Sequence, residues 1–308
     1  EMTYPVVSAR SAGSKIWDLD GNEFLDVTMG FGTYLFGHNP EFIRKAIEKQ
    51  LQTGIEIGPQ NAVAGEVARI ICGLSGMERV TFCTTGSEAV MGAVRAARTV
   101  TGRHKVVYFS GDYHGIHEEV LAKGQWVQGR SRTVPIAPGI PMELVSQVHV
   151  LTYGDPASLE WIRAHADDLA AVLVEPVQSR KPELQPKEFL LALRELTREK
   201  GIALIFDEIV TGFRIHQRGA QAWYGVQADL ATYGKIIGGG LPIGVIAGRH
   251  AYLDAFDGGM WQYGDSSVPE AGVTFFAGTF VRHPLAMAAA KAVLDYLGER
   301  GPALQEEL

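Results

Sequence analysis

The chain has 308 residues, of which 46% are apolar and 20% are charged, a composition with ample material for a folded core. Its formal net charge of −7 gives no electrostatic reason to expect nucleic acid or an anionic membrane as a partner. We recognise no signal peptide and no apolar run of about 18 residues, so we expect a cytoplasmic protein. The only two cysteines, Cys72 and Cys83, predict no disulfide framework.

The N-terminal part predicts a hairpin followed by two helices. Residues 16–26 alternate around an Asp-Gly-Asn turn, which is typical of a β-hairpin. Residues 40–53 and 63–74 repeat apolar side chains at helical spacing.

From residue 80 onward, short apolar segments alternate with amphipathic ones. Uniformly apolar strands separated by helices predict an α/β fold, with a mostly parallel sheet and helices on both faces. The expected strands are 80–83, 106–109, 148–151, 171–174, 203–206, 230–233 and 245–247, and the expected helices are 88–101, 159–166 and 189–200. Residues 125–142 show no clear period, which predicts a long irregular loop that is either functional or disordered.

The turn Thr84-Thr85-Gly86-Ser87-Glu88-Ala89 lies between an expected strand and an expected helix. Free N–H groups at a helix N-terminus form an anion site, most naturally for phosphate. An ordinary capped turn explains the same residues, because Ser or Thr followed by Glu also suits a helix start. The nucleotide P-loop pattern is missing.

Three further segments are candidates for ligand contacts, and each is weak evidence on its own. The aromatic ring in Tyr113-His114-Gly115 could stack on a planar ring or pack in the ordinary way. The segment Glu175-Pro176-Val177-Gln178 ends a strand and offers an amide for a phenolic oxygen. The segment Phe276–Phe280 is a second candidate phosphate contact.

Two adjacent carboxylates end the strand Ala203–Phe206. Ligands of open α/β sheets bind beyond the carboxyl ends of the strands. Asp207 or Glu208 could therefore hold the proton on the pyridine nitrogen of a cofactor that has such a ring. Strand alternation says only that the two side chains point in opposite directions. The choice between them stays open on this ground, as does the alternative of a carboxylate that merely caps a turn.

Lys235 stands among apolar residues and glycines, in Leu230–Gly240. A lysine taken out of water loses its proton readily, and the neutral amine is a nucleophile that forms Schiff bases. Most lysines extend to solvent, and a loop position is the alternative. Lys235 together with an acidic partner is the minimum set of groups for pyridoxal 5′-phosphate (PLP) chemistry.

In combination and in this order, the motifs resemble those of class III PLP-dependent aminotransferases, which have fold type I. The resemblance covers nearly the whole chain and is carried by Thr85–Ala89, Tyr113–Gly115, Glu175–Gln178, Phe206–Arg214, Tyr233–Lys235 and Gly278–Phe280. Within this family the chain resembles glutamate-1-semialdehyde aminomutase-like proteins. It is most similar to the aminotransferase domains of hybrid polyketide–nonribosomal peptide synthetases, in the segments 184–189, 258–261 and 275–280.

The resemblance implies a role for each motif. Lys235 would form the Schiff base with PLP and then move protons, Asp207 would pair with the pyridine nitrogen, and Gln178 would reach the 3-hydroxyl. Glu208 would be structural. No metal is expected.

The remaining motifs would bind the phosphate and the ring. Gly86 and Ser87 would hold the phosphate, and Tyr113 would stack on the ring. Such enzymes are homodimers with active sites at the interface, so Thr279 would reach the phosphate of the partner subunit.

The resemblance also implies that the chain is divided into three parts. Residues 1–60 would form an N-terminal segment with small-domain and dimer contacts, and residues 61–284 a large PLP-binding domain. Residues 285–308 would begin a linker helix to a C-terminal small domain that is absent here.

The substrate expectation rests on a departure from the aminomutases. These carry an arginine for the substrate carboxylate in a Ser-Pro-Val-Arg segment, and the similar stretch Tyr4-Pro5-Val6-Val7 has Val7 in its place. We therefore expect amination of a β-keto acyl thioester on a carrier protein, with glutamate or glutamine as donor. A glutamate-1-semialdehyde-type aminomutase and a non-catalytic assembly module are the alternatives.

Overall fold

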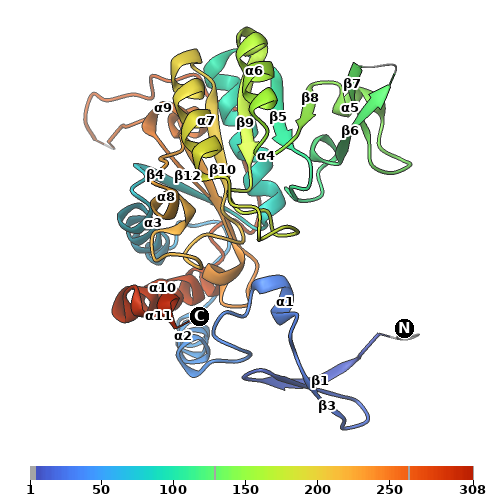
Figure 1. Ribbon diagram of the computed structural model, residues 1–308. Helices are drawn as coiled ribbons and strands as arrows, with labels where there is room; N and C mark the ends of the chain where they lie inside the picture. Colours follow the sequence, from blue (N-terminus) through green and yellow to red (C-terminus); the bar gives the residue numbers. More distant parts are fainter. Residues whose placement is uncertain (1–4, 128–129, 263, 308) are drawn as a thin grey trace.

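The computed structural model describes residues 5–127, 130–262 and 264–307, and its centre is a seven-stranded sheet (Figure 1). The strand order is β4-β12-β11-β10-β9-β5-β8. The strands β8, β5, β9, β10 and β11 run parallel, whereas β12 is antiparallel to both β11 and β4. Their bounds are β4 Arg79–Cys83, β5 Lys105–Phe109, β8 Val148–Leu151, β9 Leu169–Val174, β10 Ala203–Asp207, β11 Leu230–Tyr233 and β12 Gly244–Gly248. The predicted mostly parallel sheet is confirmed.

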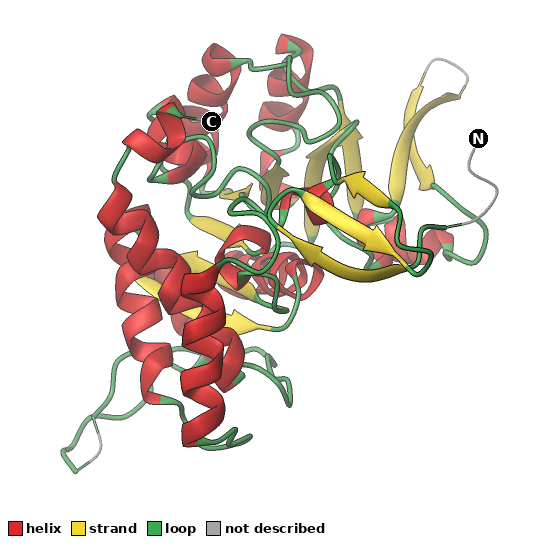
Figure 2. Ribbon diagram, turned by 90° about the horizontal axis from the view of Figure 1, so that it is seen from below, coloured by secondary structure: helices red, strands yellow, loops and turns green. Residues whose placement is uncertain are grey.

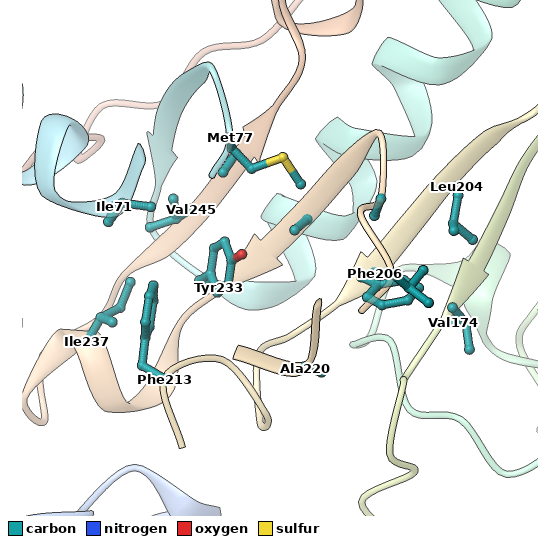
Figure 3. Packing of buried hydrophobic residues seen from close by; sticks show 14 of the residues in the cluster. Ile71, Met77, Val174, Leu204, Phe206, Phe213, Ala220, Tyr233, Ile237 and Val245 are labelled. Carbon is teal, nitrogen blue, oxygen red and sulfur yellow. The ribbon is translucent and has the colours of Figure 1, made fainter. Parts of the chain in front are cut away.

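Helices cover both faces of this sheet. Alternate strand residues point to opposite sides, so each face contributes side chains to its own buried layer. On β5, Val107 belongs to one buried cluster and Val106 to the other. Figure 3 shows the first cluster, in which Phe206 of β10 and Tyr233 of β11 pack beside helical residues such as Ile71. Seen from below, helices lie on either side of the strands (Figure 2).

The helices agree with the predicted ones to within a few residues. Asp155 caps α6 by accepting from Ala157 N at 2.9 Å, so this helix begins before residue 159. The bounds are α2 Glu41–Thr53, α3 Ala62–Ser75, α4 Gly86–Thr101, α6 Pro156–Ala164, α7 Lys187–Lys200, α8 Gly219–Tyr224, α9 His250–Leu253, α10 Pro284–Arg300 and α11 Ala303–Glu306. Single turns are α1 Met29–Gly32, α5 Met142–Val145, η1 Glu118–Val120, η2 Ala166–Asp168, η3 Lys235–Gly238 and η4 Asp254–Phe256.

The N-terminal hairpin is confirmed and has a third strand. β1 Ser8–Ala12, β2 Lys15–Asp18 and β3 Glu23–Leu25 form an antiparallel sheet apart from the central one (Figure 1). At the tip, the carboxylate of Asp18 accepts from Asn22 N at 2.8 Å and Asp20 N at 3.0 Å, which closes the turn.

Helices from the first and last parts of the chain pack together on one side of the molecule. Helix α10 packs against α2, α3 and the turn η3, so that the red and blue helices lie side by side in Figure 1. The boundaries expected at residues 60/61 and 284/285 remain predictions. Of the helices in the described part of the chain, none is long and apolar enough to cross a membrane.

The irregular loop predicted for residues 125–142 is wrong. Strands β6 Ala122–Val127 and β7 Arg130–Pro135 form an antiparallel pair, followed by the turn α5. The pairing joins Gln125 to Arg132, which are both exposed, and Lys123 to Val134. A ribbon with so many polar residues has no apolar alternation, so its sequence resembles that of a loop.

Candidate active site

A cavity of about 210 Å³ lies where five strands of the central sheet end. Its walls come from the segments that follow β4, β5, β9, β10 and β11. The lining residues are Gly86, Ser87, Val90, Tyr113, His114, Gly115, Glu175, Asp207, Ile209, Val210 and Lys235. Five of the seven predicted site residues are therefore together, namely Gly86, Ser87, Tyr113, Asp207 and Lys235.

Lys235 is half-buried and lines this cavity, which rules out the surface position that most lysines take. Burial lowers its pKa, against the opposing charges of Asp207 and Glu175. Its φ is 45°, a left-handed conformation that is uncommon outside glycine. Strained positions of this kind persist where the surrounding structure holds them in place, and they cluster at functional sites.

The structure separates the two adjacent carboxylates. Asp207 faces the cavity, and its Oδ1 accepts from Ile209 N at 3.1 Å. Glu208 points away and accepts from Ala220 N at 2.6 Å, at the start of α8. Burial raises the pKa of Glu208 to about 7. Of these two carboxylates, Asp207 thus faces the cavity, and Glu208 fastens α8 to the sheet.

The turn before α4 is both a helix cap and a wall of the cavity. Thr85 Oγ1 accepts from Glu88 N at 3.2 Å, while Glu88 Oε2 accepts from Thr85 N at 2.9 Å. This capping box leaves the first-turn residues Gly86 and Ser87 beside the cavity, at the positive end of the helix dipole. The capped-turn interpretation and the anion-site interpretation are therefore compatible.

Gly115 fits against Ser87 where no other residue would. Its φ is +100°, and a Cβ there would overlap the Ser87 hydroxyl oxygen. Ser87 Oγ also accepts from Ile116 N at 3.1 Å, so the loop after Tyr113 is fixed directly on α4.

Gln178 is buried behind the cavity and is not among its lining residues. Its Nε2 donates to Ser110 O at 3.0 Å and to Asp112 Oδ1 at 2.7 Å. Its Oε1 is buried and has no hydrogen-bond partner among the described residues. A buried oxygen without a donor is unusual in a folded protein, and this one is available as an acceptor.

Thr279 lies outside the cavity and is exposed. Its segment, with Phe276 and Gly278, lies against Cys83 and Glu88 around a separate depression. Near the other end of the chain, the side chain of Val7 is 55% exposed. Tyr4 lies outside the described residues.

Three residues of the site were missed at the sequence level: Glu175, His114 and Asp112. Glu175 Oε2 accepts from Tyr113 N at 2.8 Å. Burial raises its pKa to about 7, and the charges of Asp207 and Asp112 act in the same direction. His114 and Asp112 stand beside Tyr113, whose aromatic ring is the conspicuous feature of this segment. The available signal was a histidine two residues after an aspartate, just beyond a buried strand.

Comparisons with known proteins agree on one family. The family model "Aminotransferase class-III" matches residues 1–307. The glutamate-1-semialdehyde 2,1-aminomutase of Methanocella arvoryzae is 38% identical over 300 residues, covering 96% of this chain and 67% of that protein. The chain thus spans about two thirds of the length of this relative.

Two solved structures have the same fold. An omega-transaminase from Sphaerobacter thermophilus superposes with a TM-score of 0.88 at 32% identity, over 98% of this chain and 68% of its own. A structure described as a transaminase with PLP bound superposes with a TM-score of 0.85 at 33% identity, over 96% of this chain and 68% of its own.

The residues around the cavity fit PLP. The cofactor needs an amine for its aldehyde, a carboxylate for its ring nitrogen and N–H donors for its phosphate. Lys235, Asp207 and the first turn of α4 present these groups to one cavity. No group of three or more His, Cys, Asp or Glu side chains suited to a metal occurs among the described residues. This chain belongs to the class III aminotransferases and is a PLP-dependent enzyme of that family.

Proposed function

We propose that Lys235 Nζ holds PLP covalently, with Asp207 at the pyridine nitrogen and the phosphate at Gly86 and Ser87. The convergence of a half-buried lysine and a buried aspartate on one cavity carries this assignment. When bound, PLP supplies an electron sink for the carbon that loses a proton. Burial favours the neutral amine of Lys235, the form that removes and returns that proton.

Tyr113 and Gln178 complete the proposed cofactor site. The ring of Tyr113 borders the cavity and would stack on the cofactor ring. The free Oε1 of Gln178 would accept a hydrogen bond from the 3-hydroxyl. These two roles rest on position and on an unused acceptor, respectively.

For the reaction, we propose transfer of an amino group within one small molecule, as in the glutamate-1-semialdehyde aminomutases. Support comes from the curated relatives, several of which carry that name at 36–40% identity over nearly the whole chain. In such a reaction the amino donor and the carbonyl acceptor are parts of the same molecule.

A second candidate is amination of a β-keto acyl thioester on a carrier protein, with glutamate or glutamine as donor. One residue favours it. Val7 stands where the resemblance places the arginine that binds the aminomutase substrate, and an ester or thioester needs no such charge. The similarity to hybrid synthetase domains in the segments 184–189 and 258–261 supports the same acceptor.

Two substrate trials separate these candidates. Glutamate-1-semialdehyde alone is converted to an isomeric amino acid if the first is correct. A β-keto acyl carrier protein gains ¹⁵N from labelled glutamate if the second is correct. Mass spectrometry reads both products. The non-catalytic assembly module would be favoured if PLP-loaded protein converted neither of these substrates and also did not react with simple amino donors.

The covalent link predicts a simple result for Lys235→Ala. Borohydride should fix PLP on the native chain, so that it survives denaturation and appears in the mass of the protein. Lys235→Ala should retain no PLP after this treatment, whereas Lys45→Ala, which changes an exposed lysine, should retain it fully. Repeated turnover by Lys235→Ala without added amine would overturn the assignment.

We also propose a homodimer in which Thr279 reaches the partner's cofactor phosphate. The segment that carries Thr279 exposes large apolar side chains, Phe275 at 79% and Phe280 at 55% exposure. Exposed apolar groups that gather in this way mark contact surfaces.

Subunit mixing tests this arrangement. Lys235→Ala and Thr279→Ala should each be impaired as homodimers. After the two are unfolded and refolded together, about half of the dimers should be mixed, and each mixed dimer has one site with both native residues. We therefore expect activity to return above that of either variant. No recovery, or a monomer in sedimentation, would contradict the shared site.

A further inference from the structure

Asp112 connects two parts of the site that the fold brings together from distant segments. Its side chain is fully buried, three residues after β5. Its Oδ1 accepts from Gln178 Nε2 at 2.7 Å, and its Oδ2 lies 3.2 Å from His114 Nε2. One carboxylate therefore contacts both the amide behind the cavity and the imidazole in its wall.

His114 continues this contact to Asp207. Its Nδ1 lies 2.8 Å from Asp207 Oδ2, and its side chain is 1% exposed. Each ring nitrogen thus faces a carboxylate, which accepts hydrogen bonds but donates none. Both contacts to ionised carboxylates are satisfied together when both nitrogens carry protons, which is the imidazolium form.

The groups around His114 favour that charge. Burial lowers its pKa, but the hydrogen bonds and charges of Asp112 and Asp207 outweigh burial and raise the pKa to about 10. The nearby charged or titratable groups are Asp112, Asp207, Glu175, Lys235, Tyr108 and His117.

We propose that Asp112 is a positioning residue that controls both ends of the cofactor ring, through His114 at the ring nitrogen and through Gln178 at the 3-hydroxyl. A protonated His114 bonds to Asp207 Oδ2 at 2.8 Å and places a positive charge beside that carboxylate. Held in this way, Asp207 would pair with the protonated pyridine nitrogen of the bound cofactor. At the other end, Nε2 of Gln178 is held by Asp112 and Ser110 O, which leaves Oε1 free for the 3-hydroxyl. This inference rests on the proposed cofactor contacts of Asp207 and Gln178.

The protonation of His114 is measured directly by ¹⁵N NMR of histidine-labelled protein, with and without PLP. At pH 8 both ring nitrogens should carry protons in the native chain, and the signals are assigned by their loss in His114→Gln. Asp112→Asn should leave one ring nitrogen unprotonated at this pH. Asp26→Asn is the matched control, since it breaks another aspartate–histidine contact, to His38 at 2.7 Å, and should leave the His114 signals unchanged.

A second measurement concerns the cofactor. Asp112→Asn should raise the dissociation constant for PLP about tenfold, the effect of one weakened charge-assisted hydrogen bond. Asp112→Glu should recover part of that loss. Asp26→Asn should bind PLP as the native chain does.

Two failures are distinguishable. A neutral His114 in the native chain at pH 8, beside normal PLP uptake, overturns the relay and leaves the proposed function standing. This outcome needs no variant, so a misfolded Asp112→Asn cannot obscure it. An imidazolium in a native chain that takes up no PLP overturns the proposed function, and with it the role of Asp112 at the cofactor.

Discussion

At the scale of single residues, Glu175 gives the site a measurable dependence on pH. Its pKa of about 7 in the folded chain exceeds its ordinary value of 4.5, mainly because it is buried. Between these values the folded chain binds more protons than the unfolded chain, so stability falls as pH rises from about 4.5 to about 7. Glu175→Gln should flatten this fall when urea denaturation is compared at pH 5 and pH 7.5. Glu195→Gln, at an exposed glutamate, should leave the slope as it is. An unchanged slope in Glu175→Gln would contradict the raised pKa.

Residues also mark the limit of prediction from the sequence. Lys235 and a carboxylate at the end of the strand 203–206 could be predicted because a charged side chain next to an apolar strand is conspicuous. The contacts of Asp112 and His114 could not be predicted, because His114 and Asp207 are 93 positions apart and neither segment indicates that the two residues meet. From the residues alone the choice between Asp207 and Glu208 stays open, and only the family resemblance favours Asp207. Both end one strand, and only the fold decides which side of the sheet holds the cavity.

At the scale of elements, the cap of α4 determines the shape of the proposed phosphate site. Thr85→Ala removes the acceptor for Glu88 N and should destabilise the chain by about 1 kcal/mol. Because fraying begins at Gly86 and Ser87, PLP should also bind more weakly. Thr99→Ala, an exposed change on the same helix, is the control for both effects. Urea denaturation and PLP titration supply the two measurements, and equal behaviour of the two variants would show that the cap is unimportant.

Elements were predictable where burial made their pattern plain. The seven central strands are mostly apolar, so their positions follow from the sequence within about two residues. The pair β6–β7 was not predicted, because exposed strands lack a continuous run of apolar residues. The strand β1 escaped as well, since its side chains are mostly exposed.

At the scale of the whole molecule, Gly239 joins three distant parts of the chain. It follows the lysine turn η3 with φ +58°, and a Cβ there would lie 2.8 Å from Ile43 of α2 and 3.3 Å from Val293 of α10. Gly239→Ala should therefore cost about 2–3 kcal/mol, from both backbone strain and overpacking. Gly201→Ala separates the two causes, because Gly201 has φ +61° with nothing within 4 Å, and about 1 kcal/mol is expected there. Thermal or urea denaturation measures both, and equal losses would show that the junction tolerates a methyl group.

This junction has a consequence for how the protein is made. The ribosome releases η3 before α10, so for some time the turn that carries Lys235 has no helix to pack against. During that interval Ile236 and Ile237, both buried in the finished molecule, lack part of their cover. The left-handed backbone of Lys235 is also without one of its supports. Synthesis from the N-terminus therefore leaves the lysine turn η3 without its contacts to α10 until residues 284–300 have emerged.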